Sequence, residues 1–86
     1  MNEKNIDNLF RNTKIGDLFY IKEISTAKLF NIYTSTFQDT ILPFKFLVGI
    51  VIDINEDTIT LFSSEKEILK FSKEELNDYN VLEKFS

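Results

Sequence analysis

The chain has 86 residues, carries 10 Lys and Arg against 14 Asp and Glu, and contains no cysteine and no histidine. A chain of this length makes one domain with a single core, and nine Phe, three Tyr and eleven Ile provide apolar area for that core. The missing residue types exclude thiolate and imidazole catalysis, zinc sites built from Cys and His, and any disulfide.

The N-terminal segment has the pattern of a short amphipathic helix. Ile6, Leu9 and Phe10 follow the i, i+3, i+4 spacing of one helix face. We therefore expect a helix that ends near Thr13, before the pattern breaks at Gly16 and a strand begins.

The next segments alternate at strand spacing. We expect a first strand over residues 18–24, a turn at 25–26 and a second strand over 29–34. Residues 35–44 contain Pro43, which cannot donate to a sheet and restricts the residue before it. This segment is predicted to be the one long loop of the domain, either functional or a variable hairpin tip.

Residues 45–54 predict a central strand, because apolar side chains lie on both of its faces. A turn at 55–57 leads into a fourth strand over 58–63, and Gly49 predicts a bend or bulge. One face of the central strand is expected to carry Phe46, Val48, Ile50, Ile52 and Ile54, and the other Leu47, Gly49, Val51 and Asp53.

A turn at 63–65 leads to a short fifth strand over 67–71, and Ser72 with Glu75 forms a capping box that begins a helical turn. The apolar tail is expected to pack on the sheet or to pair as a last strand through Tyr79, Val81, Leu82 and Phe85. Short turns, bent strands and a helical turn before the last segment predict one mainly β domain over residues 1–86, a small barrel of about five strands.

Two motifs carry a resemblance to SH3-like barrels over residues 15–71. Residues 15–21, Ile-Gly-Asp-Leu-Phe-Tyr-Ile, resemble the opening of such barrels, where a Gly-Asp turn begins the first strand. Residues 49–54 followed by 57–61 are similar to their central hairpin. The same opening resembles that of one family of bacterial toxin-immunity proteins with this kind of barrel.

No motif for catalysis or for cofactor binding stands out. Residues 53–57, Asp-Ile-Asn-Glu-Asp, resemble the start of an EF-hand loop, but Thr58 and Ser64 replace the required Gly and Glu. Neighbouring carboxylates such as Glu74 and Glu75 diverge on exposed turns, and two glycines cannot form a phosphate-binding loop. We therefore expect no enzyme activity, no cofactor and no metal ion.

The net charge of −4 arises in the second half of the chain, because residues 1–43 are balanced and residues 44–86 hold five basic and nine acidic side chains. Such a field favours a basic partner surface over nucleic acid or anionic membrane, although mild acidity also serves solubility alone. We expect a non-catalytic protein-binding module whose partner contacts an acidic set at exposed turns: Asp53, Glu56, Asp57, Glu65 and Glu67.

The codon-driven excess of Ile, Lys, Asn and Phe favours a low-GC bacterium or its phage, where an inhibitor or an immunity or anti-defence protein could cover a basic target surface. The absence of a basic N-terminal segment before an apolar run predicts no secretory signal and a soluble, cytoplasmic protein. The alternative is a barrel that binds nucleic acid or a small ligand through exposed aromatics, namely Tyr20, Tyr33, Phe37 and Phe44. The partner, the oligomeric state and the strand order stay open.

Overall fold

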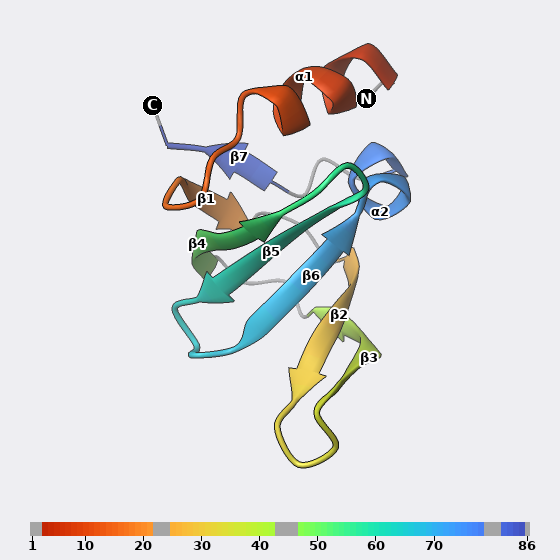
Figure 1. The fold of residues 1–86 in the computed structure, drawn as a ribbon, viewed down its shortest axis with the longest axis vertical. Helices are drawn as coiled ribbons and strands as arrows, with labels where there is room; N and C mark the ends of the chain where they lie inside the picture. Colours follow the sequence, from red (N-terminus) through yellow and green to blue (C-terminus); the bar gives the residue numbers. More distant parts are fainter. Residues whose placement is uncertain (1–2, 22–24, 43–46, 79–81, 86) are drawn as a thin grey trace.

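The computed structural model describes residues 3–21, 25–42, 47–78 and 82–85. Within these ranges the elements are α1 (Glu3–Arg11), β1 (Leu18–Ile21), β2 (Ser25–Asn31), β3 (Thr36–Leu42), β4 (Leu47–Ile54), β5 (Thr58–Ser63), β6 (Ile68–Ser72), α2 (Lys73–Asp78) and β7 (Leu82–Lys84). The strands form one antiparallel sheet in the order β3-β2-β6-β5-β4-β1-β7 (Figure 1).

The mainly β prediction is confirmed, but the prediction of a closed barrel of about five strands is wrong. The described residues form seven strands in one open sheet, with β3 and β7 at its two edges. The tail does pair as a last strand, because β7 lies antiparallel to β1 from Phe19 opposite Lys84 to Ile21 opposite Leu82. Tyr79 and Val81 lie outside the described residues.

The prediction of a long loop at 35–44 is wrong, because residues 36–42 form the edge strand β3. β3 pairs with β2 along seven residues, and β2 already begins at Ser25, where a turn was predicted. β2 ends at Asn31, so the second strand is shorter at its C-terminal end than predicted. Three consecutive polar residues, Gln38, Asp39 and Thr40, interrupt the alternation along β3, which is why its sequence indicates a loop rather than a strand.

A tight turn at residues 32–35 replaces the predicted loop. The Asn31 side-chain oxygen accepts the backbone N–H of Tyr33 at 2.8 Å and that of Thr34 at 3.3 Å. Ser35 completes the turn in the left-handed region with φ of 56°. An asparagine that bonds the backbone two and three residues ahead is a general device for turns, so the β2–β3 hairpin turns here and extends from the body at the bottom of Figure 1.

The predicted hairpins at the centre of the chain are confirmed. β5 has the expected bounds, and the Asn55 side-chain oxygen accepts the N–H of Asp57 and of Thr58, both at 2.9 Å. The turn into β6 is held by Ser63, whose hydroxyl accepts the N–H of Glu65 and of Glu67. Local polar chemistry therefore sets both ends of β5.

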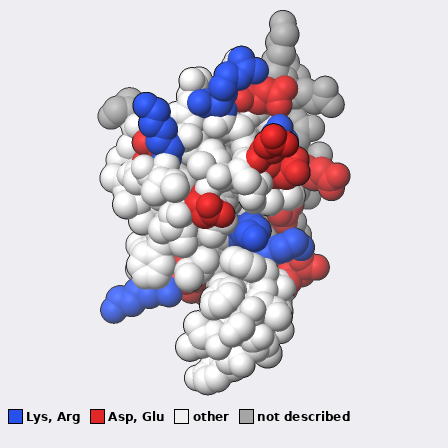
Figure 2. All heavy atoms as spheres, viewed as in Figure 1, with Lys and Arg blue, Asp and Glu red and all other residues white. Residues whose placement is uncertain are grey.

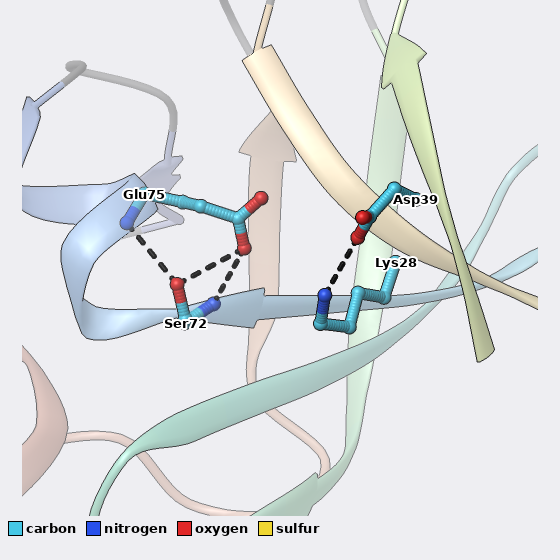
Figure 3. Close-up of polar contacts among 4 residues, drawn as sticks. All are labelled: Lys28, Asp39, Ser72 and Glu75. Carbon is cyan, nitrogen blue, oxygen red and sulfur yellow. Dashed lines mark hydrogen bonds and ion pairs between the residues drawn. The ribbon is translucent and has the colours of Figure 1, made fainter.

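The capping box is also confirmed. The Ser72 hydroxyl accepts the Glu75 N–H at 3.2 Å, and the Ser72 N–H donates to Glu75 Oε1 at 3.0 Å (Figure 3). Two of the backbone donors at the start of α2 thus find partners. α2 can begin directly at the end of β6, where it places Leu76 in the core.

One face of the sheet packs with the two helices to form the core. α1 contributes Ile6, which the sequence predicts on its apolar face, and α2 contributes Leu76. The sheet contributes Phe19, Ile21, Ala27, Leu47, Val51, Ile59, Leu61, Leu69, Phe71 and Leu82, all buried. This core uses alternate residues of the strands and leaves their other face, the outer face, toward solvent.

The bulge in β4 lies at Ile52, between Val51 and Asp53, and not at the predicted position, Gly49. Gly49 instead makes room on the core face, because a β-carbon there would lie 3.1 Å from the Cβ of Leu61. The predicted face assignment is therefore wrong for Asp53 and Ile54, whereas Ile52 lies on the same face as Ile50, as predicted. The extra residue, Ile52, shifts the phase of β4, so that Asp53 is exposed and Ile54 packs partly against the core.

Replacing Gly49 by valine should destabilise the protein by about 1–3 kcal/mol, because the new side chain overpacks the core against Leu61. Urea unfolding followed by circular dichroism measures the change. Ile50→Val, on the outer face of the same strand, should stay close to wild type. An unchanged midpoint for Gly49→Val would show that Leu61 can move aside without cost.

The Gly-Asp turn before β1 anchors both neighbouring strands. Gly16 has φ of +97°, and its N–H donates to the Val51 carbonyl at 2.8 Å. The Asp17 carboxylate accepts the Lys14 N–H at 2.8 Å and lies 3.1 Å from the Lys84 ammonium of β7. The Lys14 N–H, followed by Lys84, lowers the pKa of Asp17 below its usual value of 3.8.

Because the folded-state pKa of Asp17 is depressed, the carboxylate stabilises the fold above the ordinary pKa, and this contribution is lost as the pH falls through the folded-state value. Below about pH 4, the wild type should therefore lose stability more steeply than Asp17→Asn. Urea titrations over a series of acidic pH values measure both slopes. Lys84→Met, which removes the cation, should also flatten the slope, whereas parallel curves for all three proteins would contradict this role.

Candidate binding face

An apolar row crosses the outer face of the sheet. Leu18 of β1 lies opposite Ile50 of β4, Ile50 lies opposite Phe62 of β5, and Phe62 lies opposite Ile68 of β6. Leu18, Ile50 and Phe62 are 42%, 38% and 41% exposed, and Ile68 is half-buried. Because the core is formed on the other face, this contiguous row is not needed to close it.

A polar row runs beside the apolar row across five strands. The bulge brings Asp53 opposite Thr60, and the register continues from β5 to β6, to β2 and to β3 through Thr60, Lys70, Lys28 and Asp39. The Lys28 ammonium contacts Asp39 at 2.6 Å (Figure 3). This hydrogen bond raises the pKa of Lys28 above its usual value, although both side chains are largely exposed and the pair adds little stability.

A hollow of about 260 Å³ opens between the two rows. Two aromatic rings, Phe30 and Phe37, form one wall and pack edge to face, with their ring centres 5.2 Å apart. The Lys70 ammonium lies 4.2 Å from the centre of the Phe37 ring. The full lining is Phe30, Phe37, Ile52, Asp53, Thr60, Ile68 and Lys70. The hollow thus combines apolar walls with a hydroxyl, a carboxylate and an ammonium.

The five predicted acidic residues do not form one cluster. Asp53 lies on the outer face at the hollow, whereas Glu56 and Asp57 are exposed in the β4–β5 turn. Glu65 and Glu67 follow the other end of β5, with Glu65 exposed and Glu67 half-buried. In the view of Figure 2, acidic and basic groups surround a broad uncharged area instead of gathering in one negative field.

The β4–β5 turn also faces α1 across an open groove of about 600 Å³. Glu56 and Asp57 line this groove together with Asp7, Arg11 and Lys73. Lys73 lies 3.2 Å from the Asp7 carboxylate, so part of the charge in the groove is already compensated. The groove is therefore of mixed charge, and its acids border the outer face from one end.

The aromatic residues of the alternative prediction are also dispersed. Tyr20 of β1 stacks on Phe85 with ring centres 4.1 Å apart, and Phe37 lines the hollow from β3. Tyr33 is 93% exposed at the tip of the β2–β3 hairpin, and Phe44 lies outside the described residues. Since β1 and β3 are separated by four strands, the three described rings offer no continuous stacking platform.

The sequence alone does not indicate the apolar row, because apolar residues on both faces of β4 predict a strand that is buried on both sides. The pairing of adjacent hairpins could have indicated it. When β4, β5 and β6 are aligned in register, their outer faces form one apolar surface, and the core is already formed on the other face. The predicted acidic residues were found by their position in turns, which requires no knowledge of the register.

Comparison with known protein families, with curated proteins and with solved structures found no match to this chain. The resemblance to toxin-immunity proteins therefore stays a prediction, whereas the open sheet of the described residues is not the expected SH3-like barrel. Among the described residues, no three acidic side chains gather as metal ligands, and no helix is both long and apolar enough to cross a membrane. Fold and face together define a small antiparallel sheet domain with an apolar outer row bordered by charges.

Proposed function

We propose that this chain is a non-catalytic protein-binding domain and that its partner binds the outer face of the sheet. The observation that carries the proposal is the apolar row, in which four strands align Leu18, Ile50, Phe62 and Ile68 in direct register. Contiguous exposed apolar side chains with a polar border mark interaction surfaces, and interfaces combine an apolar centre with a polar rim in the same way.

The acidic residues around this face support a partner with basic groups at the matching border. Asp53 lies on the face, Glu56 and Asp57 border one end of β5, and Glu65 and Glu67 border the other. Rim charges of this kind steer a partner of opposite sign and fix its orientation more than they add affinity. A protein that covers a basic surface in this way would act as an inhibitor, in keeping with an immunity or anti-defence role in a low-GC bacterium or its phage.

Replacing Ile50 and Phe62 together by threonine should weaken partner binding by about tenfold or more, because central apolar anchors carry most interface energy. Both positions are exposed, and threonine suits a strand, so folding should be preserved. The wild-type and variant chains are compared as baits in a lysate of the source organism, with recovered proteins quantified by mass spectrometry.

The matched control replaces Ile15 by threonine. Ile15 is 67% exposed, but it lies in the turn before β1 and is not one of the paired residues of the apolar row. The proposal expects the control to retain the same partner as the wild type. Equal loss in both variants, or no loss in the row variant, would contradict the outer face as the binding surface.

Reversing the charge of Glu56 and Asp57 to lysine should slow association with the captured partner and reduce the salt dependence of the association rate. Biolayer interferometry at low and high salt measures both effects. The control is Glu74→Lys, an exposed carboxylate on α2. Unchanged or faster association of the double variant would instead favour a partner with negative charge, such as nucleic acid.

A further inference from the structure

The Thr60 hydroxyl is an unsatisfied group at the hollow on the outer face. Thr60 is 4% exposed, and its Oγ1 has no hydrogen-bond partner among the described residues. Thr58 Oγ1 also lacks a partner there, but Thr58 does not line the hollow. Because a buried hydroxyl without a partner is unfavourable, a group that reaches Thr60 gains a hydrogen bond and removes this penalty.

The charges on either side of Thr60 select the kind of group that can enter. Asp53 lies opposite Thr60 on β4, and Lys70 lies opposite Thr60 on β6. Asp53 and Lys70 carry opposite charges, so a charged group at Thr60 would be attracted by one neighbour and repelled by the other, and neither sign of charge is favoured. A neutral group that both donates and accepts hydrogen bonds is compatible with both neighbours.

The walls of the hollow select a ring. Phe30 and Phe37 form an aromatic pair, and Ile52 and Ile68 complete the apolar lining. Aromatic rings pack well edge to face on such pairs. A volume of about 260 Å³ lies below the range of about 300–1,000 Å³ that is typical for drug-sized ligands, so it suits a single side chain.

We infer that the hollow is the anchor site for a tyrosine side chain of the partner, with its phenol hydroxyl directed to Thr60. This inference rests on the proposed protein-binding function and names the residue type that the outer face recognises. Tyrosine combines a ring with one neutral hydroxyl, and it is among the residues most enriched at interface hot spots.

Entry of the phenol requires the Lys70 side chain to move aside. Lys70 is half-buried directly beside Thr60, and its ammonium contacts the Phe37 ring. It has no carboxylate partner among the described residues, in contrast to Lys28, which is held by Asp39. A long side chain held by one ring contact can rotate away from Thr60 and leave room for the phenol.

The test is an NMR titration of the full-length, ¹⁵N-labelled protein with N-acetyl-tyrosinamide and, separately, with N-acetyl-phenylalaninamide. The tyrosine probe should shift the amide resonances of residues around the hollow and bind about three- to tenfold more tightly than the phenylalanine probe, the gain typical of one hydrogen bond. 3-Phenylpropionate and phenethylammonium serve as charged probes, and both should bind more weakly than N-acetyl-tyrosinamide.

Thr60→Val keeps a similar shape without the hydroxyl. It should bring the two amide probes to equal affinity while shifting the urea midpoint upward, because the unsatisfied group is gone. Thr40→Val, a threonine on β3 that does not line the hollow, is the matched control and should keep the preference for tyrosine. The midpoint verifies that each variant is folded.

No resonance shifts at the hollow would overturn the anchor site, and equal binding of the two amide probes to the wild type would overturn the role of the hydroxyl. Tighter binding of either charged probe would overturn the choice of a neutral anchor. In each of these cases the proposed function is still supported if the Ile50 and Phe62 double variant loses its partner. Conversely, if that double variant keeps its partner although the tyrosine probe binds the hollow, the proposed function is contradicted and the anchor site is not.

Discussion

The phase of β4 is the constraint on which the outer face depends. Before the bulge, alternate residues of β4 point to the core, ending with Val51, and a strand of regular period would send Asp53 there too. The extra residue at Ile52 prevents the burial of an unpaired carboxylate, which would be very unfavourable. The same shift brings Asp53 to the hollow beside Ile52 and returns Ile54 toward the core.

The edge hairpin completes the chemistry of this face. Lys28 and Lys70 lie directly opposite each other on β2 and β6, an arrangement that is unfavourable for two like charges. β3 provides both compensating groups, a carboxylate from Asp39 for Lys28 and a ring from Phe37 for Lys70. The segment that its sequence indicates as a loop is therefore the strand that makes the polar row stable and walls the hollow.

Much of the local structure could be predicted from the sequence, because it is specified by neighbouring residues. The turn at Asn55, the bounds of β5 and the capping box of Ser72 and Glu75 depend on hydrogen bonds within a few positions. β3 could not be predicted in this way, since an edge strand carries polar residues that resemble those of a loop. The open sheet also escaped prediction, because strand order depends on pairings between distant segments, such as Leu29 with Leu69.

The same distinction applies to the candidate site, where features set by neighbouring residues could be predicted and features set by strand pairing could not. Five acidic residues were predicted to be exposed from their place in turns. Asp53, Glu56, Asp57 and Glu65 are exposed, whereas Glu67 is half-buried. The apolar row was not predicted, because each member becomes part of a surface only when four strands are aligned. If the carboxylates served solubility alone, they could lie anywhere on the surface. Under the proposed binding function, an apolar row places an additional demand on the same charges, since its border must discourage self-association while it admits a partner. Carboxylates at both ends of β5 meet that demand, because two copies that met face to face would bring like charges together.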